Sequence, residues 1–336
     1  MGQGREGRRD YGELMRTTAA LAFLTLLLVG TAAAQSYPVE PVRLIVGFAP
    51  GGAVDIVARA TAQGMRDVLG QQISVDNRTG ANGAIGTEAV AKAPADGYTI
   101  GLGSISTLVL NVHLNSKTPY QTLRDFTPIG SIGQVPSAIA MHPAVPVRGM
   151  KQLIALARSQ PRGKILMGSS GVGGIQHLTI EVLNNVAGIG IDHVAYKGAV
   201  PALTDVLGGH IDGLVVSLPS VIGPANARKL NIIAVTGDQR SPALPDVPTA
   251  KEQGLPDLVM VNWYALVGPA NLPAQTVTTL HAAIAKAVAS PGFKEKFSAA
   301  GIEPRTDASP AAFSRFLGDE FTRWQKIISH SGVKIE

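Results

Sequence analysis

Strand-like and helix-like segments alternate along most of this chain. Residues 43–48 and 72–77 have the apolar character of strands, and 54–69 between them repeats apolar residues at helical spacing. Gly70 directly follows the helical segment, as glycine commonly does at a helix C-terminus. Because strands that alternate with helices favour a parallel sheet covered by helices, the sequence predicts an α/β protein.

The same order starts again near residue 150. A helix is predicted over 150–160, a strand over 164–170 and a further helix over 175–187. The chain ends with three predicted helices, near 273–289, 291–299 and 309–330. Two α/β units followed by helices predict a protein of two lobes, which a chain of 336 residues is long enough to form.

The composition excludes several classes of protein. Lys and Arg are scattered, the formal net charge is +5 and aromatic residues make up 5% of the chain, so nucleic-acid binding is not expected. The chain has no Cys, which excludes a disulfide framework, a thiolate metal site and a Cys nucleophile. The mild positive balance favours a small anion as partner.

Residues 1–34 are predicted to be a signal peptide with an N-terminal extension. Arg16 precedes an apolar run that ends in small residues at Ala32–Ala34, which is typical of a cleavage site. A transmembrane anchor is the alternative, but the run is short for a span and Thr residues interrupt it. The start is open between Met1 and Met15. The mature protein is therefore expected to be soluble and exported to the periplasm.

Three strand–loop–helix junctions are rich in glycine: APGGA at 49–53, TGANGAIG at 79–86 and SSGVGG at 169–174. Glycine allows close backbone approach, and a helix N-terminus presents free N–H groups at the positive end of its dipole. In an open α/β sheet, ligands bind at the carboxyl ends of the strands, where these loops lie. The junctions therefore predict a site for an anion such as a carboxylate, although a change of chain direction explains any single one equally well.

Polar side chains stand at these junctions. Ser104, Ser169 and Ser170 follow predicted strands, where hydroxyl groups suit anion recognition as well as turn formation. Asp55 falls in the first turn of the helix after the first junction. A role as general base is open there, but stabilisation of the loop and of the helix dipole is favoured.

Signatures of catalysis and of metal binding are thin. The chain contains no Walker loop, no complete G-x-G-x-x-G and no G-x-S-x-G nucleophile elbow. His177 and Glu181 lie four positions apart on a predicted helix, which is compatible with metal ligation, but no third ligand is close in sequence. A solvated or capped pair is therefore favoured. The sequence predicts a binding protein with no catalytic residue, no metal and no cofactor.

The motifs together resemble one family. Along the mature chain come, in order, YPVEPVRLIVGFAPGGAVDIVAR, DNRTGANGAIGTEAVAKAPADGYTI, SSGVGGIQHL, HVAYKGAVPALTDVLGGHID and LPDVPTAKEQG. They are similar to the Bug family, the extracytoplasmic substrate-binding proteins of tripartite tricarboxylate transporters. The resemblance implies a two-lobed, type II-like periplasmic binding protein of the Venus flytrap kind, each lobe a mostly parallel sheet flanked by helices. It also implies a discontinuous first lobe, 36–138 plus 263–336, and a second lobe of 139–262.

The resemblance implies a small organic anion as ligand: a di- or tricarboxylate, an acidic amino acid or an aromatic acid. Family members hold a carboxylate with backbone amides and ordered waters at two opposed loops, which match 49–53 and 169–174 here. Three positions depart from the family pattern and leave the ligand open: Gly174, Ala49 and Ala195 stand where Ser, Pro and Pro are usual. The predicted ligand-binding residues are Phe48, Ala49, Pro50, Gly51, Gly52, Ala53, Asp55, Ser104, Ser169, Ser170, Gly171, Gly173 and Gly174.

The leading prediction is thus an exported, monomeric protein that binds a small carboxylate, performs no chemistry and serves the membrane subunits of a transporter. Two alternatives stay open. One is a ligand-sensing module that uses the same cleft and reports to a signalling partner. The other is an exported α/β enzyme acting on a carboxylated substrate, which requires a nucleophile or base with a positioned partner.

Overall fold

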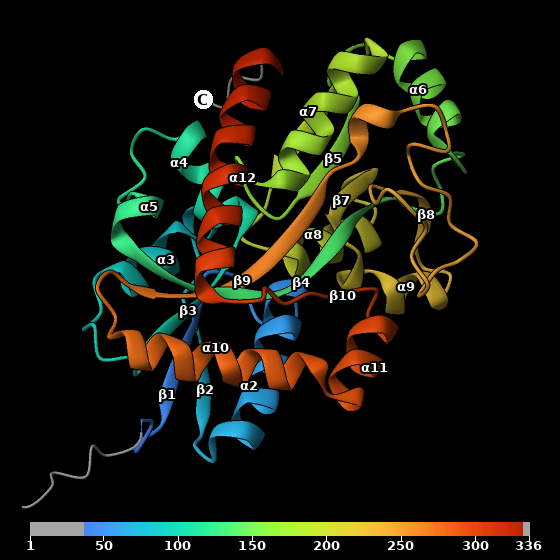
Figure 1. Ribbon diagram of the computed structural model, residues 1–336. Coiled ribbons are helices and arrows are strands. Elements are labelled where there is room, and N and C mark those ends of the chain that lie inside the picture. The colour runs from blue at the N-terminus through green and yellow to red at the C-terminus, as the bar shows by residue number, and fades with distance from the viewer. Residues whose placement is uncertain (1–36, 332–336) are drawn as a thin grey trace, which may run out of the picture. The chain divides into compact units, whose positions relative to one another are not determined.

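The computed structural model of the protein describes residues 37–331. The chain divides into a short N-terminal unit, residues 1–39, and a main unit, residues 40–336. All the described helices and strands belong to the main unit (Figure 1). The predicted signal peptide, residues 1–34, lies outside the described residues. Within 37–331, no helix is both long and apolar enough to cross a membrane.

The strands of the described chain pair into one continuous sheet. They are β1 (Val42–Val46), β2 (Ile73–Asn77), β3 (Thr99–Ser104), β4 (Phe126–Met141), β5 (Ile165–Ser169), β6 (Ile191–Ala195), β7 (Gly213–Ser217), β8 (Asn231–Val235), β9 (Val261–Pro269) and β10 (Glu303–Pro304). Neighbouring strands follow the order β2-β1-β3-β9-β4-β7-β5-β6, and β8 and β10 both pair with β4.

Helices and short helical turns connect and cover these strands. The helices are α2 (Ala53–Leu69), α3 (Ala84–Ala91), α4 (Asn111–Leu114), α5 (Thr122–Asp125), α6 (Met150–Ser159), α7 (Ile175–Ala187), α8 (Ala199–Leu207), α9 (Ile222–Asn226), α10 (Ala274–Ala289), α11 (Pro291–Ala299) and α12 (Pro310–Ser331). The turns are η1 (Ala81–Gly83), η2 (Ser106–Leu110), η3 (Leu218–Ser220) and η4 (Pro256–Leu258). The helices predicted over 54–69 and 175–187 are both present, and Gly70 ends the first of them in the left-handed conformation.

Strand direction divides the sheet into parallel and antiparallel parts. β1 runs parallel to β2 and β3, and β5 runs parallel to β6 and β7, as the alternating pattern predicted. β4 and β9 are antiparallel to all their neighbours. The parallel strands therefore form two groups, one on each side of an antiparallel β4–β9 pair.

The long strand β4 belongs to both groups. Its residues 126–136 pair with β9, and its residues 137–141 pair with β7 and β8. We call β1, β2, β3, β9, β10 and the first part of β4 the first sheet half. The remaining strands and the second part of β4 are the second sheet half. β4 is thus a covalent and hydrogen-bonded connection between the halves.

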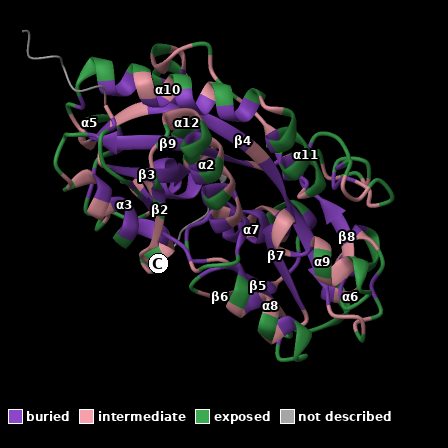
Figure 2. Ribbon diagram, turned by 90° about the horizontal axis from the view of Figure 1, so that it is seen from below, coloured by how far each residue is buried: buried purple, intermediate pink, exposed green. Residues whose placement is uncertain are grey.

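Helices cover both faces of each sheet half (Figure 1). On the first half, α2, α10 and α11 pack together against one face, while α3 and α12 pack against the other. On the second half, α7 packs against β5, β6 and β7, and α8 packs against β5 and β7. The strands are consequently buried and the outer helix faces are exposed, as Figure 2 shows.

Apolar side chains between these layers form the core. In the first half, Trp263 of β9 packs with Phe313 and Trp324 of α12 in one cluster. In the second half, Met167 of β5 and Leu183 of α7 belong to another. Strands that are buried on both faces need nearly continuous apolar sequence, which explains the runs in 42–46 and 213–217.

A buried carboxylate fixes α12 to the first sheet half. Glu320 is only 7% exposed, and its Oε2 accepts hydrogen bonds from the indole N–H of Trp263 at 2.9 Å and of Trp324 at 3.2 Å. Its Oε1 accepts a hydrogen bond from Arg323 Nη1 at 2.9 Å. Because both indoles are almost fully buried, Glu320 is the acceptor that satisfies their N–H groups.

Replacement of Glu320 should therefore destabilise the protein. Glu320→Ala leaves two buried indole donors without an acceptor, and we expect the free energy of unfolding to fall by about 1–3 kcal/mol. Arg323→Ala is the matched control, because the Arg323 side chain is 59% exposed and its pair is worth less than about 1 kcal/mol. Denaturant unfolding measures both. Equal losses in the two variants would contradict the assigned role of Glu320.

Candidate functional site

Two adjoining cavities lie at the carboxyl ends of the parallel strands. The smaller, of about 20 Å³, is lined by Ser104 at the end of β3 and Ser217 at the end of β7, and we call it the inner cavity. The larger, of about 490 Å³, is the outer cavity. Phe48 and Ser170 line both. Because residues from both sheet halves contribute, the two cavities form one cleft between the halves.

The two linings come from loops that are far apart in sequence. The inner cavity is lined by Phe48, Ala49, Gly52, Ala53, Val54, Ser104, Ser106, Ser170, Gln176, Ala199, Ser217, Ser220 and Asn262. The outer cavity is lined by Gly47, Phe48, Gly80, Ala81, Asn82, Gly83, Asn111, Leu114, Asn115, Ser116, Lys117, Ser170, Gly171, Val172, Gly173, Ala195, Tyr196 and Lys197.

The Asp55 side chain stabilises the first loop, residues 47–52. Its Oδ2 accepts the Gly51 N–H at 3.0 Å and Arg59 Nε at 2.8 Å, and its Oδ1 accepts Asn77 Nδ2 at 3.1 Å. Asn77 also donates to the Phe48 carbonyl at 3.0 Å. Burial acts to raise the pKa of Asp55, but the hydrogen bonds from Arg59, Gly51 and Asn77 outweigh it and lower the pKa. The ionised carboxylate therefore sets the shape of this loop.

Glycine lets the first loop approach its neighbour. A Cβ at Gly47 would lie 2.6 Å from the Gly83 carbonyl oxygen, and one at Gly86 would lie 2.8 Å from the Gly47 Cα. Since real Cβ atoms do not come so close to backbone, only glycine fits at these positions. The first loop, at Gly47, is thus in direct backbone contact with the glycine-rich junction 79–86.

The structure divides the predicted first-loop residues into two groups. Phe48 and the backbone of Ala49, Gly52 and Ala53 line the inner cavity, as does Ser104. Pro50 and Gly51 are exposed and line neither cavity. Asp55 also lines neither, so its contacts are with the loop and not with the cleft. These three residues shape the loop from outside the described cavities.

The second loop, residues 169–174, is divided in the same way. Ser170 lines both cavities, and Gly171 and Gly173 line the outer one. Ser169 is fully buried, and its Oγ lies 2.6 Å from His193 Nε2. Gly174 lines neither cavity. Ser170 is therefore the one of the two adjacent serines that faces the cleft.

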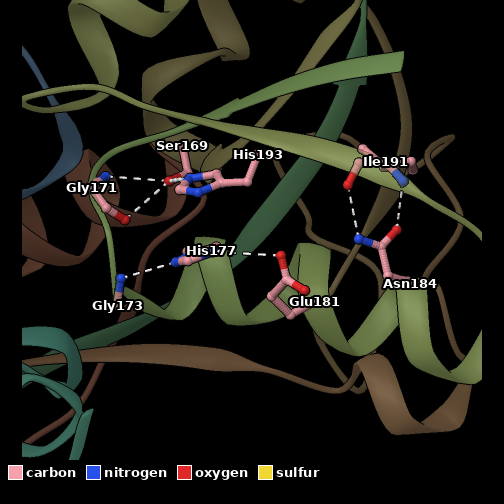
Figure 3. A network of polar contacts seen from close by, with 8 residues as sticks. All are labelled: Ser169, Gly171, Gly173, His177, Glu181, Asn184, Ile191 and His193. Carbon is pink, nitrogen blue, oxygen red and sulfur yellow. Dashed lines mark hydrogen bonds and ion pairs between the residues drawn. The ribbon is translucent and has the colours of Figure 1, made fainter. Parts of the chain in front are cut away.

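Ser169 and His193 are close enough to act as a nucleophile and its base, but the Ser169 hydroxyl does not face the cleft. The Ser169 hydroxyl faces the backbone of Gly171, to which it is hydrogen-bonded, and it lines no cavity (Figure 3). His177 Nε2 lies 3.5 Å from Glu181 Oε1. Within residues 37–331, no group of three or more His, Asp or Glu residues could hold a metal ion around this pair or elsewhere.

Direct contacts join the two sheet halves across the cleft. The Ala53 N–H donates to Ser220 Oγ at 3.1 Å, and the Ile175 N–H donates to Ser106 Oγ at 3.1 Å. A Cβ at Gly174 would lie 3.0 Å from Asn82 Oδ1. The protein is thus in a closed arrangement, in which loops of one half touch those of the other.

A chain of hydrogen bonds, which the sequence analysis missed, crosses the inner cavity. Gln176 Nε2 donates to Ser217 Oγ at 3.1 Å, and that hydroxyl lies 3.3 Å from the Tyr264 hydroxyl. Asn262 Nδ2 donates to the Tyr264 hydroxyl at 3.0 Å, while Asn262 Oδ1 has no hydrogen-bond partner within the described residues. Burial raises the pKa of Tyr264 to about 12, so its hydroxyl stays neutral. The cavity therefore presents an unused amide oxygen beside several hydroxyls.

Helix N-termini, and no charged side chain of the described lining, surround the inner cavity. None of its described lining residues carries a charge. Three helices, α2, α7 and α8, begin there, and each has glycine as N-cap, which offers no side chain to the first-turn N–H groups. Such N-termini favour an anion. The outer cavity adds two exposed cations at its edge, Lys117 and Lys197.

Replacement of Asp55 tests its role behind the first loop. In Asp55→Ala, the Gly51 N–H and the Asn77 amide lose their acceptor, and we expect the free energy of unfolding to fall by about 1–3 kcal/mol at neutral pH. Since the native pKa lies below the ordinary value of 3.8, this stabilisation is complete above that pH and is lost as the pH falls through the lowered pKa. Urea unfolding at several pH values measures the difference. A difference that does not shrink in acid would contradict the assignment.

Known proteins share both the sequence and the fold of this chain. Protein BugT of Bordetella pertussis is 34% identical over 328 residues, which cover 96% of this chain and 100% of BugT. The solved structure of R. palustris Rpa4515 with adipate has a TM-score of 0.85 and 32% identity, covering 89% of this chain and 99% of that one. MatC (Rpa3494) from Rhodopseudomonas palustris with bound malate has a TM-score of 0.82 and 26% identity, covering 87% and 100%.

A family model agrees with these comparisons. The model described as "Tripartite tricarboxylate transporter family receptor" matches residues 57–333, which is more than half of the chain. This match and the similarity to BugT confirm the Bug-family resemblance and the two-lobed α/β fold that it implied. Members of the family are periplasmic solute-binding receptors and not enzymes. The chain belongs to the tripartite tricarboxylate transporter receptor family.

Proposed function

We propose that this receptor captures a small organic acid in the cleft between its lobes and delivers it to the membrane subunits of a tripartite tricarboxylate transporter. One observation carries the proposal: three glycine-capped helix N-termini and several hydroxyls meet at an uncharged inner cavity. Such a set of donors suits a carboxylate, which needs several hydrogen bonds to offset the loss of water. The bound adipate and malate of two similar proteins support the same ligand class.

The carboxylate binds where the two cavities meet, beside Ser170 and Phe48. The inner cavity, at about 20 Å³, has room for a water but not for a carboxylate. A water there would donate to Asn262 Oδ1, which has no partner within the described residues, and pass a hydrogen bond to the acid. Ser170 lies on the lining from one lobe, and Val54 at the start of α2 lies on it from the other.

The rest of the ligand occupies the outer cavity. Its volume of about 490 Å³ is that of a site for a small molecule. Phe48, Leu114 and Val172 give it apolar walls, and Lys117 and Lys197 stand at its edge on opposite lobes. A second carboxylate of the ligand would lie between these lysines. A dicarboxylate with an apolar middle therefore fits the cleft better than a compact monocarboxylate.

We propose the lobe boundaries that the family resemblance implies: 36–138 plus 263–336, and 139–262. The change of partners within β4, after residue 136, supports the first boundary. The start of β9 at residue 261 supports the second. The lobes then hinge where these two strands cross between them, and the closed contacts form around the ligand. The protein acts as a monomer, since each chain holds a full cleft.

Binding of acids to the mature protein tests the proposed function. We expect a dicarboxylate such as adipate or malate to raise the melting temperature, because a ligand at about 100 times its Kd adds about 2.7 kcal/mol to the folded state. Adipamide is the matched uncharged control and should give no shift. A thermal-shift panel followed by calorimetry measures both. Stabilisation by uncharged compounds but by no acid would contradict the proposal.

Gly52→Val tests the position of the acid. Gly52 has an ordinary φ of −81°, so valine fits the backbone, and its methyl groups would extend into the inner cavity beside Ala199. We expect binding to weaken at least about tenfold, with a loss of about 1 kcal/mol in stability from the poorer N-cap. Gly318→Val, whose Cβ would point into open space on α12, is the control. Normal binding by Gly52→Val would show that the acid lies elsewhere.

Charge at the edge of the outer cavity should govern specificity. Replacement of Lys117 and Lys197 by Gln removes two exposed cations, each worth up to about 1 kcal/mol. We expect adipate to bind about two- to fivefold more weakly per lysine, while hexanoate, which lacks the second carboxylate, changes little. Lys286→Gln on α10 lines neither cavity and serves as control. Equal losses for both acids would place the second carboxylate away from these lysines.

A further inference from the structure

Two stacked histidines lie behind the second loop (Figure 3). The rings of His177, in the first turn of α7, and His193, on β6, have centroids 3.7 Å apart and an angle of 16° between their planes. Neither His177 nor His193 lines the inner or the outer cavity. The pair therefore contacts the loop from its inner side and does not face the cleft.

The contacts of His177 fix its protonation state. Its Nδ1 accepts the Gly173 N–H at 3.0 Å, so Nδ1 carries no proton. Its Nε2 lies 3.5 Å from Glu181 Oε1, which suits an N–H on that side. A proton added at Nδ1 would leave two donors facing each other and break the bond to the loop. The neutral ring is thus the form that holds Gly173.

His193 holds the other end of the loop through Ser169. Its Nε2 lies 2.6 Å from Ser169 Oγ, which contacts the Gly171 carbonyl at 3.1 Å and the Gly171 N–H at 3.3 Å. Burial, and then the neighbouring His177, lower the pKa of His193 to about 4. His193 therefore stays neutral in mild acid, and a positive charge on His177 would disfavour a second positive charge on His193.

The first lobe has an equivalent hydrogen bond, in which a different side chain is the acceptor. In both lobes, the third residue of the helix reaches back four positions to accept an N–H of the preceding loop: Asp55 from Gly51, and His177 from Gly173. The Asp55 carboxylate remains an acceptor down to low pH, because its pKa is lowered. The imidazole of His177 loses its acceptor on protonation. Of the two loops, only the second is held by an imidazole acceptor.

Few other charged groups surround the histidines. α7 carries Glu181, whose pKa the neighbouring His177 lowers against the effect of burial. On the elements packed against α7, β6 carries Asp192, next to His193 but on the opposite face of the strand, and η4 carries the exposed Asp257. β5 and β7 carry no charged residue. Glu181 and His193 are therefore the titratable side chains in direct contact with His177.

We propose that His177 and His193 are positioning residues that hold the second loop in its ligand-binding form only while both rings are neutral, so that the receptor captures its acid tightly at neutral pH and weakly in acid. The inference rests on the proposed function and adds regulation of that same site. The loop presents Ser170 and Gly171 to the cleft, and α7 directly after it donates to Ser106 of the other lobe. Release of the loop therefore weakens both ligand binding and lobe closure.

The direction of the effect follows from the preferred protonation state. Imidazoles in proteins gain their proton at about pH 5–8. The bound form requires an unprotonated Nδ1 on His177, so binding opposes protonation, and affinity falls as the pH falls through that range. Tighter binding in acid would require a cationic ring that faces the acid, but neither ring lines the inner or the outer cavity.

Variants of His177 separate the hydrogen bond from the titration. In His177→Asn, Oδ1 takes the place of Nδ1 and accepts the Gly173 N–H without titrating, whereas His177→Ala removes the acceptor. His142→Asn is the matched control. His142 Nδ1 also accepts a backbone N–H, from Ala144 at 3.2 Å, but it follows β4 at the end of the sheet remote from the cleft.

Calorimetry with adipate on the mature protein measures the affinity at about pH 8 and about pH 5.5. We expect the wild type and His142→Asn to lose about tenfold more affinity between these values than His177→Asn, in which binding is rescued relative to His177→Ala. Comparison of variants at one pH cancels the titration of adipate itself. Equal losses in the wild type and His177→Asn would overturn the inference and leave the proposed function intact.

A measurement on the ligand-free protein tests the role of the histidines separately from the proposed function. In nuclear magnetic resonance spectra of the ligand-free protein, we expect the Gly171 and Gly173 amide signals to shift with the same midpoint as the His177 ring, and not to shift in His177→Asn. Gly171 and Gly173 amide signals whose pH dependence does not follow that of the His177 ring would overturn the inference. If adipate binds at neither pH, the proposed function loses support, and this titration alone decides whether the histidines hold the loop.

Discussion

Hydrogen bonds that helix side chains accept from the preceding loops determine the shape of the cleft. A loop that binds an anion through N–H groups must keep those groups pointed at the ligand, and glycine does not do so by itself. Here Asp55 accepts the Gly51 N–H and His177 accepts the Gly173 N–H, each from the first turn of the helix that follows. These hydrogen bonds hold both loops in one conformation beside the cavities. The two loops are rich in flexible glycine, yet these hydrogen bonds fix which way their N–H groups point.

The connection between the lobes lets these donors come from both sides. β4 pairs with β9 in one lobe and with β7 and β8 in the other, so a small rotation at this strand moves one loop relative to the other. The closed contacts, such as Ile175 N–H to Ser106 Oγ, are hydrogen bonds between neutral groups. Neutral contacts of this kind are individually modest, so a ligand that bridges both loops can shift the balance between open and closed forms.

Local sequence signals predicted much of this structure. The helices over 54–69 and 175–187 and the glycine junctions before them are present, because helical periodicity and glycine are local properties. The sequence of β4 contains no comparable local signal for a strand. It contains Pro128, Gly130, Gly133 and Pro136, which ordinarily end strands, and its register shifts at two of these places accommodate them.

The parts of the site that sequence did not predict depend on tertiary structure. Gln176, Ser217 and Asn262 come from distant segments and meet only because β7 ends, and β9 and α7 begin, at the same edge of the sheet. Likewise, the sequence SSGVGG does not distinguish Ser169 from Ser170. The alternation of side chains along β5 and the presence of His193 turn Ser169 inward and leave Ser170 at the cavities.

A crystal structure of the mature protein with adipate is the most decisive measurement, because it locates the acid itself. We propose that one carboxylate of the acid is held at the junction of the two cavities by uncharged donors from both lobes. The predicted result is one carboxylate within hydrogen-bond distance of Ser170 and of N–H groups from both loops, with no Lys or Arg in contact with it. A structure in which neither carboxylate lies at this junction, or in which the carboxylate there pairs with a cationic side chain or contacts one lobe alone, would contradict this assignment.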